Sequence, residues 1–392
     1  MRKFGRIMAR IWIIIGITLV AVFLALYIML VQFKAGPSES AKKLFITTIL
    51  ETGQMKFLAR WVCSEEEIAE IVEGNKMQAM DDDVDTSLIN IKPAKESESV
   101  TVDIPTSDPA VDQPTNAPGT EETEPPAETE APTEPAPQEV WDANGIRLEE
   151  ISGRTFSAKM LIIKNPAQVQ VASTYPWGDV GQELDILINN AGAVAGINGG
   201  LYVSKGNTGG KPMGVVVQHG QIIYNSPWGI AGLYLIGFNN DNILIVKNLD
   251  GWSPAQIEEY IVSAGIRDAV SFQDEASDSN NHFVPIVING EPRKLDGQGS
   301  GANPRTVIGQ RSDGAVLLLV TDGRGTSGHL GATASDLIDI MLKYGAVNAA
   351  NLDGGSSSTM VYNGNWEMTS VTFYFQSTSW KLPTAFAVMP AM

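Results

Sequence analysis

The sequence predicts an α+β fold class, in which one domain rich in mixed or antiparallel sheet and carrying a few helices follows a transmembrane helix and a disordered linker. Three observations support this prediction. An uncharged apolar run lies near the N-terminus, a Pro- and acid-rich stretch follows residue 92, and from Trp141 onward short β-rich runs alternate with Gly, Asn and Asp. Strands outnumber helices in that last part without alternating with them, which disfavours a doubly wound parallel fold.

The overall composition already excludes several classes of protein. The chain has 392 residues, enough for one large or two ordinary domains, and its net charge is -18. Nucleic acid and anionic lipid bind clustered Lys and Arg, so an acidic balance argues against a general affinity for either. A single cysteine, Cys63, excludes a disulfide scaffold.

The first element is a transmembrane helix at residues 11–33. These 23 residues carry no charge, and at 1.5 Å per residue they span a hydrocarbon core of about 30 Å. A cleaved signal peptide is the rival interpretation, but its apolar region is usually about 7–15 residues long. Four basic residues precede the run, so residues 1–10 are expected in the cytoplasm and the rest of this single-pass protein outside the cell membrane.

Two segments separate this helix from the domain. In residues 36–92, apolar side chains recur at helical spacing among charges, which predicts a juxtamembrane helical segment, either a stalk or a self-association element. Residues 93–139 contain ten prolines, twelve acidic residues and no aromatic residue. Such a stretch buries too little apolar surface to offset its conformational entropy, so we expect a disordered, self-repelling linker.

The remaining chain, residues 140–392, contains thirteen runs with strand character. We expect strands at Phe156–Ile163, Val169–Ser173, Ala193–Asn198, Gly214–His219, Gln221–Tyr224, Leu233–Phe238, Ile243–Lys247, Pro285–Ile288, Arg305–Gln310, Ala315–Thr321, Ala349–Leu352, Thr359–Tyr362 and Ala385–Met389. Three helices are expected at Gly181–Asn190, Ser253–Ala264 and Ala332–Tyr344. Ser253 and Pro254 form a typical helix start, and Gly345 a typical stop.

Four polar clusters, each beside glycine, lie at the ends of these strands. They are Gly196-Ile197-Asn198-Gly199-Gly200, Asn303-Pro304-Arg305-Thr306, Asp322-Gly323-Arg324 and the stretch from Asn351 to Ser358. Each cluster alone is a common turn signal. Four in one domain indicate a shared site.

The residue types in these clusters fit a phosphorylated sugar. Arg305 and Arg324 are suited to bidentate contacts with phosphate or carboxylate. Asp322 and Asp353 are candidate acids, bases or nucleophiles. The candidate uncharged donors are the side chains of Asn198, Thr306 and Ser356 and the backbone of Gly354 and Gly355.

Other chemistries fit the sequence less well. A nucleophile elbow, a P-loop and a zinc ligand set are missing from the sequence. Asp274, Glu275 and Asp278 predict a solvated acidic loop rather than a calcium site. His329 is expected to be a surface or capping residue, and the alternative is a place near the site, because it lies between the third cluster and the helix that follows. We predict no metal and no cofactor, while the sequence leaves a divalent cation open.

At the four clusters the sequence resembles the phosphodiester glycosidase family. The resemblance covers most of residues 145–390 and is densest in NPRTVIGQRSDGAVLLLVTDGR and in GATASDLIDIMLKYGAVNAANLDGGSSSTM. GINGGLY and KPMGVVVQHGQII match the family pattern upstream, in the same order. The sequence departs from it at Lys381, where an Arg is expected, and in the loop 274–281.

The resemblance implies an activity and a set of site residues. It implies hydrolysis of a sugar joined through its anomeric carbon to a phosphodiester, with Asn198, Arg305, Asp322, Arg324, Asp353 and Ser356 in the active site. One carboxylate would activate water or attack the anomeric carbon. Asp353 is favoured over Asp322 for that role by a small margin.

The expected partners are a phosphosugar or glycan polymer, such as a wall or exopolysaccharide glycan, and the lipid bilayer through residues 11–33. A non-catalytic glycan-binding or scaffolding protein and a glycosyl-phosphodiester transferase in polysaccharide assembly remain the alternatives.

Overall fold

The computed structural model describes residues 2–36, 38–52, 55–80, 82–91, 140–203, 206–276, 281–371 and 378–391. The predicted linker, 93–139, lies outside these residues. Residues 1–91 and 141–392 form one compact unit.

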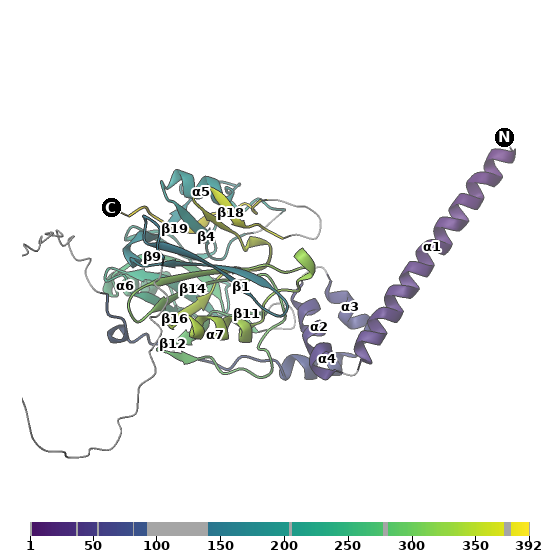
Figure 1. Cartoon of the computed structure of the whole chain (residues 1–392), viewed down its shortest axis with the longest axis horizontal. Helices are drawn as coiled ribbons and strands as arrows, with labels where there is room; N and C mark the ends of the chain where they lie inside the picture. The colour runs from purple at the N-terminus through teal and green to yellow at the C-terminus, as the bar shows by residue number, and fades with distance from the viewer. Residues whose placement is uncertain are drawn as a thin grey trace, which may run out of the picture. The chain divides into compact units, whose positions relative to one another are not determined.

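Three antiparallel sheets build the domain, which confirms the predicted fold class (Figure 1). The largest has the order β1 (Ile146–Ser152), β2 (Ser157–Ile163), β15 (Val316–Thr321), β14 (Thr306–Arg311), β16 (Ala346–Asn351), β12 (Pro285–Ile288), β13 (Glu291–Pro292). The second has the order β18 (Asn365–Met368), β17 (Met360–Tyr362), β4 (Ala195–Asn198), β19 (Thr384–Val388), β3 (Val169–Ser173). The third has the order β6 (Gln221–Ser226), β5 (Gly214–Gln218), β9 (Ile266–Gln273), β7 (Leu233–Asn239), β8 (Leu244–Asn248). A short hairpin pairs β10 (Glu275–Ala276) with β11 (Asn281–His282).

The main core lies between the sheets, and one helix covers the outer face of each. In β15, Leu318 packs into the central core while Leu317 and Leu319 face α7 (Ala334–Lys343). This alternation follows from the two-residue period of a strand buried on both faces. The helix α6 (Pro254–Ser263) covers the third sheet in the same way, and α5 (Leu184–Asn190) covers the second.

All thirteen predicted strands and all three predicted helices of the domain overlap observed elements. Strands β1, β9 and β18 were not predicted from the sequence. In β9 the cause is Asp268, a charge inside a buried strand. Its carboxylate accepts from the backbone N–H of Val171 and His219 and pairs with Arg267 Nη1 at 2.6 Å, so protein groups replace the lost water.

The N-terminal residues form four helices: α1 (Arg2–Lys34), α2 (Glu39–Glu51), α3 (Lys56–Val62) and α4 (Glu65–Glu73). Within α1, residues 7–32 are long and apolar enough to cross a membrane, by length and composition. The predicted span 11–33 falls inside α1. Of residues 75–80 and 82–91, only the turn η1 (Thr86–Leu88) is helical. These residues contact the domain, as in the bond from Gln78 N–H to the carbonyl of Lys294.

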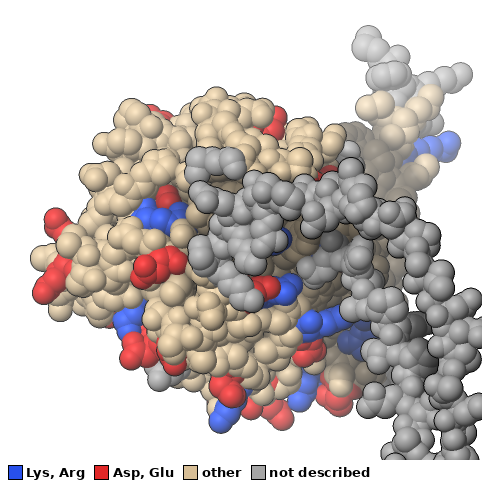
Figure 2. All heavy atoms as spheres, turned by 60° about the vertical axis from the view of Figure 1, so that its left-hand side comes forward, with Lys and Arg blue, Asp and Glu red and all other residues tan. Residues whose placement is uncertain are grey.

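On the face of the molecule in Figure 2, acidic and basic side chains are interspersed among uncharged surface.

Candidate active site

Antiparallel pairing brings three of the four clusters together. The start of β14 lies between the ends of β15 and β16, because Thr306 pairs with Val320 and Val307 with Asn351. The clusters at Arg305, Asp322 and Asp353 therefore meet at one edge of the large sheet. The fourth comes from another sheet, at the end of β4.

Asn198, at the end of β4, joins that cluster to the others. Its Nδ2 donates to the carbonyl of Asp353 at 2.7 Å, and its Oδ1 accepts from Thr306 Oγ1 at 2.8 Å. The Thr306 hydroxyl also lies 3.2 Å from Ser358 Oγ. Asn198 and Thr306 are fully buried and bonded to protein groups. In this structure they hold the clusters in register, and their predicted contact with substrate stays a prediction.

Asp353 follows β16, and its carboxyl group is enclosed by protein. Burial raises the pKa of Asp353 to about 6. Hydrogen bonds from Ser357 and from the backbone of Gly354, together with the charge of Arg324, act in the opposite direction. Desolvation therefore dominates over three favourable contacts. Other atoms of Asp353 remain partly exposed.

Arg324 lies beside Asp353. Its Nη1 donates to Ser356 Oγ at 2.8 Å. Burial and the neighbouring charge of Arg305 lower the pKa of Arg324 to about 10, and Asp353 partly compensates. Arg324 has the left-handed φ of 54°, and a Cβ on Gly355 would lie 2.6 Å from Arg324 Nη2. A side chain at Gly355, in the turn η4 (Gly355–Ser357), would displace the guanidinium, and the φ of +63° disfavours any residue but glycine there.

Asp322 contacts a different partner. Its Oδ1 accepts from Ser157 N–H at 2.8 Å, and its Oδ2 lies 2.6 Å from His329 Nδ1. If Asp322 is ionised it only accepts hydrogen bonds, so the imidazole would donate from Nδ1, and in a neutral ring Nε2 would be the acceptor. His329 was expected to be a surface or capping residue, with a place near the site as the alternative. The turn η3 (Thr326–Gly328) returns it to Asp322, so the alternative holds.

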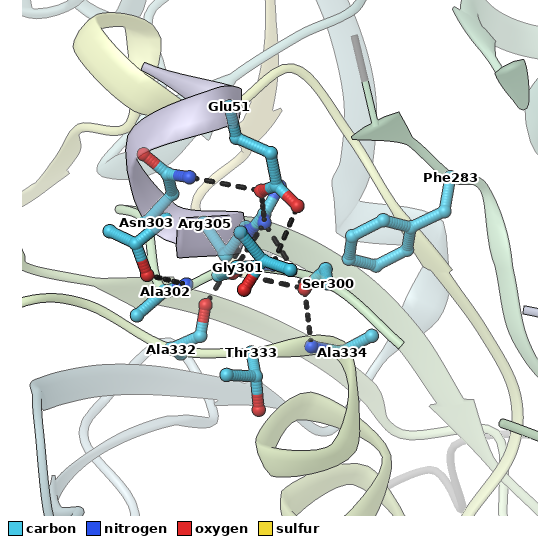
Figure 3. A network of polar contacts seen from close by, with 12 residues as sticks. Glu51, Phe283, Ser300, Gly301, Ala302, Asn303, Arg305, Ala332, Thr333 and Ala334 are labelled. Carbon is cyan, nitrogen blue, oxygen red and sulfur yellow. Dashed lines mark hydrogen bonds and ion pairs between the residues drawn. The ribbon is translucent and has the colours of Figure 1, made fainter. Parts of the chain in front are cut away.

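Arg305 points toward a residue that the sequence analysis did not consider (Figure 3). Its Nη2 lies 2.7 Å from Glu51 Oε2, at the end of α2, and also donates to Ser300 Oγ and to the carbonyl of Gly301. Its guanidinium lies over the ring of Phe283, 4.9 Å from the ring centroid. Glu51 and Arg305 are 254 positions apart, and no local pattern in either segment signals the contact.

Among the residues that the structure describes, no group of three or more His, Cys, Asp or Glu side chains is placed to hold a metal ion. Asp274 is engaged by Arg293 and by the backbone of Val284 rather than forming a solvated loop. Asp278 lies outside the described residues.

The chain is similar in sequence to one protein family and to two known proteins. A family model described as phosphodiester glycosidase matches residues 191–389. The chain is 42% identical over 64 residues to the SPbeta prophage-derived uncharacterized protein YomE of Bacillus subtilis, which is 16% of this chain and 10% of that protein. It is 34% identical over 79 residues to N-acetylglucosamine-1-phosphodiester alpha-N-acetylglucosaminidase of Bos taurus, 20% of this chain and 14% of that protein. The matches therefore span a small part of these relatives' length.

Two solved structures are similar at low identity. One is the zebrafish N-acetylglucosamine-1-phosphodiester alpha-N-acetylglucosaminidase catalytic domain auto-inhibited by pro-peptide, with a TM-score of 0.47, 18% identity and coverage of 62% of this chain and 82% of that one. The other is a hypothetical protein from Synechocystis, with a TM-score of 0.38, 16% identity and coverage of 62% and 61%.

Proposed function

The chain belongs to the phosphodiester glycosidase family, and on that premise we propose that residues 140–392 hydrolyse the bond between the anomeric carbon of a sugar and a phosphodiester. The observation that carries the proposal is the meeting of the four clusters, joined by the Asn198 bonds to Asp353 and Thr306, where Asp353 and Arg324 lie near enough for each charge to shift the pKa of the other. Cleavage of such a bond requires a carboxylate at the anomeric carbon and a cation at the phosphate, and Asp353 and Arg324 supply these two groups.

The chemistry needs little acid catalysis on the leaving-group side. The bond from the anomeric carbon to the phosphate oxygen breaks, and its electron pair leaves with the phosphate, which is a far better leaving group than an alcohol. Arg324 stabilises the charge on that phosphate. Water supplies the hydroxyl that ends on the sugar.

Asp353 is the carboxylate we assign to the anomeric carbon, as a nucleophile or as the base that activates water. Its raised pKa, about 6, lies close to neutrality, as suits a base. Both oxygens of Asp322 are already engaged, one by the backbone N–H of Ser157 and the other by the ring of His329. We therefore assign Asp322 as a positioning residue, which orients His329 for proton transfer.

The N-terminal part of the chain suggests where the protein is located. The apolar helix at residues 7–32 is compatible with a membrane anchor. We propose that it holds the enzyme at the cell membrane with residues 140–392 outside, and that the acidic stretch 93–139 is a spacer that gives access to a wall or exopolysaccharide glycan. This part of the proposal rests on composition.

Substrate hydrolysis tests the proposal. The full chain, purified in detergent, is incubated with UDP-GlcNAc, with synthetic glycosyl phosphodiesters of several sugars, and with the simple alkyl glycosides of the same sugars as controls. We expect release of free sugar from at least one phosphodiester and none from its matched glycoside. Asp353→Asn should lower kcat by about 10³-fold or more, because an amide neither attacks carbon nor takes a proton.

Two results would count against this function. Sugar passed to an acceptor glycan, with no free sugar, would indicate a transferase. Binding of the phosphodiesters without turnover of any of them, or an Asp353→Asn variant as active as the parent, would indicate a glycan-binding protein that keeps the family fold.

A further inference from the structure

A buried tyrosine, Tyr202, contacts the turn that follows Asp353. Tyr202 OH lies 2.9 Å from Ser357 Oγ, and the two residues are only 7% and 5% exposed. Tyr202 belongs to the segment that leaves β4 after Asn198, whereas Ser357 ends the turn η4. The β4 segment therefore reaches the Asp353 segment twice, once through the bond from Asn198 to the carbonyl of Asp353 and once through this contact.

The position of the Tyr202 ring is fixed by its surroundings. Its backbone pairs with Pro212 in an isolated bridge. A Cβ on Gly200 would overlap the carbonyl oxygen of Ser271, so a side chain there would push the segment away from β9. The ring packs in an apolar cluster that includes Leu184, Leu187, Ile188, Val361 and Leu382. A tyrosine hydroxyl buried in this way needs polar partners, and Ser357 supplies one.

Ser357 links this tyrosine to the carboxyl group of Asp353. The Ser357 side chain hydrogen-bonds that carboxyl group and lowers the pKa of Asp353. A carboxylate only accepts hydrogen bonds, so Ser357 gives its one hydroxyl proton to Asp353, and its oxygen accepts from Tyr202 OH. The two hydrogen bonds are both directed toward the carboxylate. We call Tyr202 OH, Ser357 Oγ and the Asp353 carboxylate the hydroxyl chain.

The charged groups near Asp353 come from two other elements. The loop after β15 supplies Arg324, which lowers the pKa of Asp353, and it also holds Asp322 with His329. The start of β14 supplies Arg305, whose charge lowers the pKa of Arg324. In the proposed mechanism Arg324 also binds the phosphate, so the substrate shares its charge with Asp353. The hydroxyl chain is neutral and buried, and its support stays with Asp353.

A chain of hydrogen bonds in a buried site is more effective than its last member alone. In a medium of low dielectric, a hydroxyl that accepts one hydrogen bond becomes a better donor of the next. Without the Tyr202 hydroxyl, Ser357 would be a weaker donor and could turn its proton away from Asp353. The Tyr202 hydroxyl thus acts on a carboxyl group that it does not touch.

We infer that Tyr202 is a positioning residue of the site, which acts through Ser357 to hold the Asp353 carboxylate in place and to favour its charged form. Asp353 must be charged to attack carbon or to take a proton. The assignment of Asp353 to the anomeric carbon rests on the proposed function, whereas the hydroxyl chain rests on the contacts of Tyr202 and Ser357.

The titration of Asp353 can be followed without any substrate, by thermal unfolding of the full chain in detergent. The melting temperature of Asp353→Asn minus that of the parent should grow above about pH 4 and level off near the folded pKa, about 6. With Tyr202→Phe in both proteins, the difference should level off about half a pH unit higher. Ser357→Ala should move this point by about one pH unit. Tyr202→Phe and Ser357→Ala together should act like Ser357→Ala alone.

The matched control is Tyr362→Phe, which removes a tyrosine hydroxyl that donates to Asp142 Oδ2 at 2.8 Å. It should leave the titration of Asp353 where it is. An unmoved titration in Tyr202→Phe would overturn the inference. A further shift when Tyr202→Phe is added to Ser357→Ala would do the same, because Tyr202 would then act without Ser357. If Tyr202→Phe does not fold, Ser357→Ala carries the test, and an unmoved titration in that variant would remove the middle of the chain.

Activity separates this inference from the proposed function. On a phosphodiester that the parent hydrolyses, the acidic limb of kcat/KM should move up in pH with the titration of Asp353. A loss of kcat/KM that is equal at every pH, with the limb in place, would indicate a merely structural role or a limb set by His329, and would overturn the inference. A shifted titration without sugar release from any substrate would reject the glycosidase and keep the hydroxyl chain. Sugar release with an unmoved titration would reject the hydroxyl chain alone.

Discussion

The charge state of Asp353 links the stability of the fold to its proposed chemistry. In an unfolded chain an Asp titrates near pH 3.9, whereas burial holds the pKa of Asp353 at about 6 in the folded protein. The folded state binds more protons between these values. The stability that the neutral carboxyl contributes is therefore present below about pH 4 and is lost as the pH rises through about 6. The active, charged form is the less stable form.

Replacing Asp353 by a neutral isostere should show how much stability the buried charge costs. Asp353→Asn removes the buried charge, so at pH 8 the variant should melt a few degrees above the parent, while at pH 4 the two should melt together. Thermal unfolding of the full chain at both pH values is the measurement. Asp241→Asn changes an exposed carboxylate and should show no such pH dependence. A destabilised Asp353→Asn at pH 8 would mean that the charge contributes to folding.

At the scale of elements, the turn η4 binds Arg324 through Ser356 and leaves room for its guanidinium at Gly355. Gly355→Ala places a methyl group 2.6 Å from Arg324 Nη2 and also strains a backbone with φ of +63°. Gly364→Ala is the matched control, since Gly364 has φ of +75° and nothing within 4 Å of a Cβ. An alanine in this region costs about 1–2 kcal/mol, so both variants should lose similar stability by thermal unfolding.

Only the Gly355 variant should lose function. We expect Gly355→Ala to lower kcat/KM by about tenfold or more, because the guanidinium must leave its position, and Gly364→Ala to retain the parent value. Steady-state kinetics on the best phosphodiester substrate would decide. Equal kinetics in the two variants would remove Arg324 from the proposed mechanism.

The elements also show what the sequence could predict. Strands such as β15, buried on both faces, have continuous apolar runs, and α6 has a Ser253 cap; both signals are local. Strand β9 was not predicted because the backbone N–H groups that donate to the Asp268 carboxylate, those of Val171 and His219, are distant in the sequence. The residues of the site likewise fall into those that the sequence predicts and those that it does not. The four clusters were visible as strand ends, whereas the contacts of His329 and Glu51 depend on how turns and distant helices return to them.

At the scale of the whole molecule, the net charge of -18 says little about the site. Twelve of the acidic residues lie in residues 93–139, and the candidate site contains two arginines, Arg305 and Arg324. The site combines these two cations, which suit a phosphate, with the carboxyl groups of Asp322, Asp353 and Glu51. The first 91 residues contribute to that site as well, because α2 supplies Glu51.

The central claim is that the protein cleaves the bond from carbon to oxygen at the anomeric centre and leaves the bonds to phosphorus intact. Hydrolysis of a glycosyl phosphodiester by the full chain in water enriched in oxygen-18, followed by mass spectrometry of the released phosphate monoester, tests this claim directly. The account predicts a phosphate product without label, because the oxygen of water enters the sugar. A labelled phosphate would show attack at phosphorus and would contradict the assignment of this protein as a glycosidase.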